Sequence, residues 1–119
     1  MGYYTNYEVR AVGFEDEDSA EFFIFKLDKF VGEKLSIEKE EDWSTGELRK
    51  TYRVHGYISE RKWYNWEDNL KEMSLKFKDV LIEVEGHGEE DEDIWRARIK
   101  NGDSEIVKAE IVFPAFTKF

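Results

Sequence analysis

The 119-residue sequence contains no cysteine, one proline and two histidines. The absence of cysteine excludes a disulfide framework, thiolate chemistry and a cysteine-bound metal. Residues 1–5 lack the basic and apolar regions of a signal peptide, and no apolar run approaches the roughly 20 residues that a membrane-spanning helix needs. We therefore expect a cytoplasmic protein without membrane partners, and no motif calls for a cofactor.

The composition of the chain indicates a folded, acidic domain. Aromatic residues make up 16% and hydrophobic residues 40% of the chain, which is too many for a disordered chain even with 39% charged residues. The length suits one domain over residues 1–119. The formal charge of −10 repels nucleic acid and attracts basic partners, although negative charge also simply favours solubility.

The spacing of apolar residues predicts eight elements in the order β-α-β-β-α-β-β-β. The predicted strands cover residues 3–12, 35–42, 48–59, 80–85, 93–99 and 103–113, and the helices cover residues 15–31 and 63–77. Gly13 is predicted to end the first strand, Asp16 or Asp18 to cap the first helix, and Gly32 to stop it. The first helix has an apolar face that Phe22, Ile24 and Phe25 widen. The charged residues 38–59 fit either a hairpin with a turn at 44–46 or a mobile loop.

The C-terminal hairpin contains the strongest turn signal, Asn101-Gly102. A two-residue loop would place Trp95 opposite Lys108 and mix charge into the apolar face. A three-residue loop over residues 100–102 places Trp95 opposite Val107 and collects the apolar residues on one side. We therefore expect the three-residue loop, with the second strand running to Phe113.

This order predicts an α+β fold. Its first six elements match the split β-α-β plan of ferredoxin-like folds, with an added C-terminal hairpin and two helices on one face of an antiparallel sheet. The opposite face, which carries Arg96, Arg98 and Lys108, is expected to be open to solvent or to a partner.

Three acidic clusters are the main candidate binding sites, because carboxylates spaced over a rigid surface can imitate phosphates. The residues expected to bind a partner are Glu15, Asp16, Glu17, Asp18, Glu40, Glu41, Asp42, Glu89, Glu90, Asp91, Glu92 and Asp93, with Tyr64 as an aromatic contact. Each cluster also has a plain structural explanation, as a helix N-terminus, an exposed hairpin or a solvated loop. None has the glycine and glutamate spacing of an EF-hand, so no metal site is expected.

Other side chains suggest weaker alternatives. Tyr57 and Arg61 lie near Tyr64 and add to a candidate partner patch, whereas Trp63 and Trp66 share the spacing of core residues. The basic residues of the sheet could bind RNA, but no aromatic RNA-binding motif accompanies them. His87 could act as a base or lone ligand. No nucleophile elbow, phosphate loop or histidine pair is present, so we expect no enzymatic activity.

Short segments of the chain also resemble small bacteriophage and prophage proteins. They are Gly2-Tyr3-Tyr4-Thr5, Lys62-Trp63-Tyr64, Asp93-Ile94-Trp95 and Lys100-Asn101-Gly102. The resemblance carries no catalytic residues and implies a protein that blocks a host factor, such as a nuclease of bacterial defence. The leading expectation is an acidic, non-enzymatic inhibitor of a basic nucleic-acid-handling host protein, of the anti-restriction or anti-CRISPR kind. A self-assembling phage protein and a nucleic-acid-binding module are the alternatives.

Overall fold

A computed structural model describes residues 4–31, 36–42, 49–90, 93–110 and 112–119. The elements are β1 (Thr5–Phe14), α1 (Glu17–Val31), β2 (Ser36–Asp42), β3 (Arg49–Arg61), α2 (Trp66–Lys76), β4 (Leu81–Gly88), β5 (Ile94–Lys100) and β6 (Asp103–Lys108). The predicted α+β class and element order are confirmed. Residues 38–59 form the β2–β3 hairpin over their described part. The predicted helix stop at Gly32 and the turn at 44–46 lie outside the described residues.

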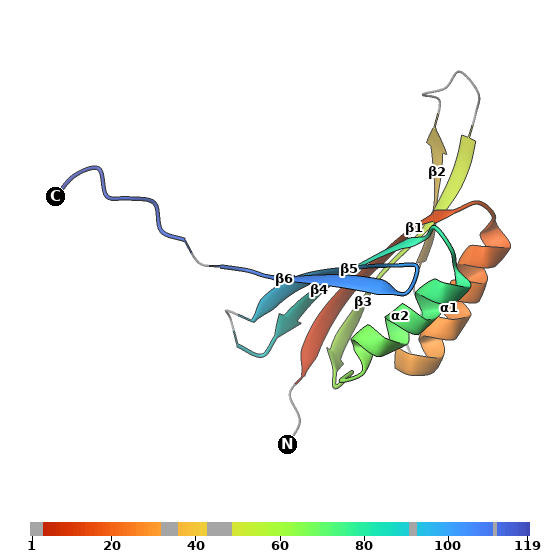
Figure 1. Ribbon diagram of the computed structural model, residues 1–119, viewed down its shortest axis with the longest axis horizontal. Helices are drawn as coiled ribbons and strands as arrows, with labels where there is room; N and C mark the ends of the chain where they lie inside the picture. The colour runs from red at the N-terminus through yellow and green to blue at the C-terminus, as the bar shows by residue number, and fades with distance from the viewer. Residues whose placement is uncertain (1–3, 32–35, 43–48, 91–92, 111) are drawn as a thin grey trace.

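The six strands form one antiparallel sheet in the order β2-β3-β1-β4-β5-β6. Strand β1 is near the middle, where it pairs with β3 on one side and β4 on the other. Both helices lie on the same side of this sheet (Figure 1). The other side of the sheet is therefore left open.

The core forms between the helices and the sheet because alternate residues of each strand point to the helices. On β1, Val9 and Ala11 are fully buried, and on α1 Phe23 is fully buried as well. The predicted apolar stripe is buried, since Trp63, Leu70, Met73 and Phe77 are buried and Trp66 is partly buried. The predicted helix bounds are too wide, because Trp63 precedes α2 and Phe77 follows it. Of the residues predicted to widen the apolar face of α1, Ile24 packs partly buried against the core, whereas Phe22 and Phe25 are about half exposed, at 48% and 56%.

The prediction that Gly13 ends the first strand is wrong. It adopts a φ of +107°, a conformation that L-residues with side chains rarely take, and the pairing with β3 shifts its register between Val12 and Phe14. A Cβ at Gly13 would lie 3.0 Å from the carbonyl oxygen of Asp79. The irregularity carries the strand on to Phe14, whose side chain is 1% exposed in the core.

The three-residue loop predicted for the C-terminal hairpin is wrong. Lys100 pairs with Asp103, so the loop has two residues, and Trp95 lies opposite Lys108. Asn101 and Gly102 have φ values of 50° and 82°, the two positive angles that a type I′ turn requires.

Neighbouring elements hold this turn in place. The backbone N–H of Gly102 donates to Ser74 Oγ at 2.7 Å, and that of Asp79 donates to Asn101 Oδ1 at 3.1 Å.

The corrected register changes which residues of β6 face the helices. Lys108 is on the helix side with Trp95, rather than on the open side with Arg96, and Val107 takes the open side. The strand ends at Lys108 and not at Phe113. None of its residues is buried, so β6 is an exposed edge whose apolar pattern does not set the register.

The start of α1 provides a direct stability test. Asp16 precedes the helix, and its Oδ1 accepts a hydrogen bond of 2.7 Å from the backbone N–H of Ser19. We expect Asp16→Ala to lower the free energy of unfolding by about 1 kcal/mol, because an orphan helix N–H loses its acceptor. Urea denaturation would measure this loss. Glu15→Ala, which removes the same charge without a cap, should change stability by less than half as much.

Candidate functional site

The open face of the sheet carries a band of charged side chains from four adjacent strands. Cross-strand pairing places Glu8 of β1 opposite Glu85 of β4, and Glu85 opposite Arg96 of β5. In the next row Arg10 lies opposite Glu83, and Glu83 opposite Arg98. The two glutamates of β4 thus face two arginines on β5 and one glutamate and one arginine on β1.

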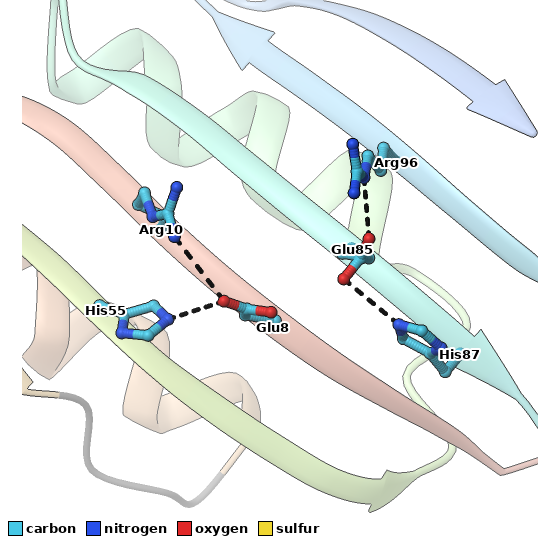
Figure 2. Close-up of polar contacts among 6 residues, drawn as sticks. All are labelled: Glu8, Arg10, His55, Glu85, His87 and Arg96. Carbon is cyan, nitrogen blue, oxygen red and sulfur yellow. Dashed lines mark hydrogen bonds and ion pairs between the residues drawn. The ribbon is translucent and has the colours of Figure 1, made fainter.

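Glu8 is the centre of the first group in this band (Figure 2). Its Oε1 lies 2.9 Å from His55 Nε2 on β3 and 3.8 Å from a guanidinium nitrogen of Arg10. The His55 ring also meets Tyr57 edge-on, with ring centroids 5.4 Å apart. The carboxylate of Glu8 therefore links β3 to β1.

Glu85 is the centre of the second group, on the neighbouring strand (Figure 2). Arg96 Nε donates to Glu85 Oε1 at 2.8 Å, and His87 Nε2 lies 3.3 Å from Oε2. The hydrogen bond from Arg96, followed by that from His87, lowers the pKa of the Glu85 carboxyl group. The same bond raises the pKa of Arg96. The two groups form an acid-centred network across β3, β1, β4 and β5.

The network borders an open depression of about 660 Å³ on this face. Its lining combines seven charged residues with three small apolar ones, namely Glu8, Arg10, Glu83, Val84, Glu85, Arg96, Ala97, Arg98, Glu105 and Val107. Within the described part of the chain, no three histidine or carboxylate side chains come together as a metal site. The depression is an open surface with four glutamates and three arginines rather than a closed pocket.

The lowered pKa of Glu85 predicts a pH-dependent contribution to stability. A carboxyl group whose folded pKa lies below its unfolded value stabilises the fold above the unfolded pKa, and this stabilisation is lost as pH falls through the folded pKa. We expect Arg96→Gln to lower the free energy of unfolding at neutral pH, and this deficit to disappear in acid. Urea denaturation over a pH series would measure it, with Lys100→Gln as a net-charge control. A deficit that does not change with pH would contradict the assignment to Glu85.

The acidic clusters lie at the two ends of the sheet. Residues 15–18 are exposed at the start of α1, just beyond the Phe14 end of β1. Residues 89, 90 and 93 follow β4, whose Gly88 pairs with Thr5 at the other end of β1. The ten residues of β1 separate these ends by about 30 Å. The first and third clusters therefore form two separate acidic regions.

The second cluster lies nearer to the first. Tyr52 of β3 pairs with both Phe14 of β1 and Lys39 of β2, so residues 40–42 continue past the end of β1 at which α1 begins. The strand pairing places only the backbone of residues 40–42, because the side chains of Glu40, Glu41 and Asp42 lie outside the described part of the structure. Asp91 and Glu92 of the third cluster also lie outside it.

The aromatic residues that precede α2 differ in their exposure. Tyr64 precedes α2 and is 68% exposed, and Tyr57 is 64% exposed on the open face. Trp63 is buried, with Nε1 donating to Asn69 Oδ1 at 2.8 Å, as its core spacing predicts.

The Glu8 and Glu85 groups were not predicted from the sequence. The alternation of apolar and polar residues predicts which face of the sheet they lie on. The partners of Glu8 and Glu85, however, lie partly on other strands, and only the strand order shows which strands are neighbours.

The chain matches no protein-family model, no curated protein and no solved structure. None of the helices in the described ranges is long and apolar enough to span a membrane.

Proposed function

We propose that the protein is a non-enzymatic acidic binding protein that inhibits a basic, nucleic-acid-handling host protein in the cytoplasm. One observation supports this proposal above others: the open face pairs its arginines with its own glutamates. Glu8, Glu83 and Glu85 lie against Arg10, Arg98 and Arg96 respectively. The excess negative charge of the chain therefore belongs to other surfaces, among them the acidic ends of the sheet.

The same pairing counts against a nucleic-acid-binding module on the open face. Phosphate contacts need cationic side chains whose charge is available to the nucleic acid. Arg96 and Arg98 are largely exposed, at 79% and 73%, but each has a glutamate within 3.5 Å. A phosphate group approaching either arginine would have to compete with that glutamate and with a net charge of −10.

The separation of the acidic ends defines what the partner would look like. Two acidic regions about 30 Å apart match a basic groove long enough for roughly nine base pairs, at 3.4 Å per step. The mixed charges between them would face the middle of that groove. A nuclease of a bacterial defence system, as in anti-restriction or anti-CRISPR action by a phage protein, is the class of partner we propose.

A pull-down tests the proposal. Tagged full-length chain is incubated with nuclease-treated bacterial lysate, and bound proteins are eluted by increasing salt. We expect a basic protein, recovered in stoichiometric amount and released by salt, because attraction between exposed charges is screened. The variant E15Q/E17Q/D18N/E90Q/D91N/E92Q keeps the Asp16 cap and should lose most of this binding.

A matched variant distinguishes the effect of the acidic ends from the effect of the net charge. D68N/E72Q/E110Q together with E21Q, D103N and E105Q removes the same number of charges at positions outside the three acidic clusters and should retain the partner. Equal losses in both variants would show that only the net charge matters. Failure to recover any basic protein from lysates of several hosts would count against the inhibitor proposal.

We also propose that the first six elements follow the split β-α-β plan of ferredoxin-like folds. The order β2-β3-β1-β4, with α1 after β1 and α2 after β3, supports this assignment. Backbone proton contacts in solution NMR that join Val9 to both Gly56 and Val84 would test it. Contacts between β1 and β2 in place of those with β3 would contradict it.

A further inference from the structure

The outer edge of β6 pairs with no other strand in the described part of the chain. Strand β6 is last in the sheet order, and its pairing with β5 runs without a register shift from Asp103 to Lys108. Residues 112–119 extend away from the body of the protein, so they leave this edge uncovered (Figure 1). An uncovered edge presents a row of backbone N–H and C=O groups to which another strand can bind.

The hairpin register determines which residues direct these groups outward. The N–H of Ala109 donates to the carbonyl of Ile94 on β5 at 2.9 Å, and in an antiparallel ladder every second residue is bonded in this way. The odd-numbered residues of β6 therefore bond to β5. Ser104, Ile106 and Lys108 direct their backbone N–H and C=O groups away from it.

The side chains of these three residues lie on the helix side of the sheet. The N–H of Ser104 donates to Asp103 Oδ1 at 2.9 Å, which agrees with its outward direction. Ser104 Oγ donates to Glu67 Oε2 of α2 at 2.7 Å and so holds a carboxylate at the edge. Ile106 is 42% exposed, and Lys108 is exposed at the end of the strand. The edge thus carries a carboxylate, an apolar side chain and an ammonium group in a row.

This row is complementary to itself when the strand is reversed. A two-fold axis perpendicular to the sheet sets two β6 strands antiparallel and keeps the helices of both copies on one side. With the axis at Ile106, this residue lies opposite its counterpart, and Ser104 lies opposite Lys108 of the other copy. An axis at Glu105 would set like charges opposite each other. An axis at Val107 would place Ser104 beyond the end of the opposite strand.

Charge complementarity selects a second copy of this chain as the occupant of the edge. Across the axis, the Cα atom of Lys108 lies about 5.5 Å from that of Ser104, beside the Glu67 carboxylate that Ser104 holds. Within one chain, Lys108 is four residues, or about 14 Å, from Ser104 along the strand. The ammonium group of each copy therefore meets the carboxylate of the other, and the two Ile106 side chains meet between these pairs.

We propose that two copies of the chain pair their β6 strands, antiparallel and centred on Ile106, to form one continuous sheet. The same surface is used by both copies, so the contact closes as a symmetric dimer. The acidic residues 15–18, 89 and 90 lie at the ends of the strands and not along the β6 edge, so the dimer leaves them exposed. The dimer does not depend on the proposed inhibitory function.

Sedimentation equilibrium of the purified full-length chain, over a wide concentration range, tests the strand pairing. We expect a monomer–dimer equilibrium. Ile106→Pro removes an N–H that β6 does not use within its own sheet, at a kind of position where edge strands accept proline. It should weaken dimerisation roughly tenfold or more, because both copies lose a backbone donor at the axis. Ile106→Val keeps the N–H and should stay within about threefold of the native chain. Circular dichroism checks that each variant is folded.

A charge exchange tests the register without altering the backbone. Glu67→Lys and Lys108→Glu each place two like-charged pairs across the axis, so each variant alone should dimerise more weakly than the native chain. An equal mixture of the two variants restores an attractive pair at both positions. We therefore expect a mixed dimer to form at concentrations where neither variant associates alone, and high salt to reduce this difference.

Several results would overturn the proposal. One is a monomer at every concentration, and another is a dimer that forms equally well with folded Ile106→Pro. A mixture of the charge variants that associates no better than either variant alone would exclude the register centred on Ile106. Open-ended chains, which pairing of β6 with β2 of another copy would produce, would also contradict the symmetric dimer.

Discussion

Replacing Phe23 by alanine is expected to lower the free energy of unfolding by about 3–5 kcal/mol, the largest effect that we predict for a single substitution. Phe23 is fully buried on α1. Its ring meets Phe14 of β1 and Phe77 after α2 edge-on, with centroids 5.4 Å and 5.3 Å away. The third pair, Phe14 and Phe77, closes the cluster at 6.0 Å. The substitution would open a cavity where both helices and the sheet meet.

Urea denaturation followed by tryptophan fluorescence would measure the loss. Phe25→Ala is the matched control, because it removes the same side chain two residues further along the same helix at a half-exposed position. At concentrations where the chain is monomeric, we expect this control to change stability by about 0.5 kcal/mol or less. Similar losses for the two variants would show that the helix packs in another orientation.

The second large effect is expected at Gly86, which lies opposite Trp95 on the neighbouring strand. A Cβ added to Gly86 would clash with the indole ring of Trp95. Trp95 in turn stacks on Trp66 of α2, with ring centroids 4.3 Å apart. We expect Gly86→Ala to cost about 2–3 kcal/mol, because the indole must leave this position and break the stack.

A double-mutant cycle shows whether the indole is the cause. Trp95→Leu removes the ring, so Gly86→Ala should cost much less in that background than in the native protein. Urea denaturation of the four proteins gives the coupling free energy, and near-ultraviolet circular dichroism follows the Trp66–Trp95 stack. Additive losses would contradict the steric explanation.

The elements could be predicted where apolar spacing and burial coincide. The stripe of the second helix identified four buried residues, because those positions face the core. An aspartate was rightly predicted to cap the first helix, because a side-chain oxygen there accepts a hydrogen bond from an otherwise unpaired helix N–H. The hairpin register failed for a related reason. None of the residues of β6 is buried, so the alternation of its apolar residues does not determine the pairing register. The two positive φ angles of Asn101-Gly102 determine it instead.

The polar network on the open face could not be derived from the sequence in the same way. Alternation assigns Glu8 and His55 to a face, but the contact between them spans 47 positions in the chain. It exists because β3 lies beside β1 with His55 opposite Arg10, one row from Glu8. Strand order and register both have to be known before such partners can be paired.

Binding of labelled probes to the purified chain tests the central claim most directly. Fluorescence anisotropy is measured with a duplex DNA oligonucleotide and with an arginine-rich peptide over a series of salt concentrations. Since the arginines of the open face are paired and the ends of the sheet are acidic, we predict no DNA binding. We predict peptide binding that weakens with salt and is lost in the six-substitution variant of the two ends. Tight DNA binding with no affinity for the basic peptide would contradict the account.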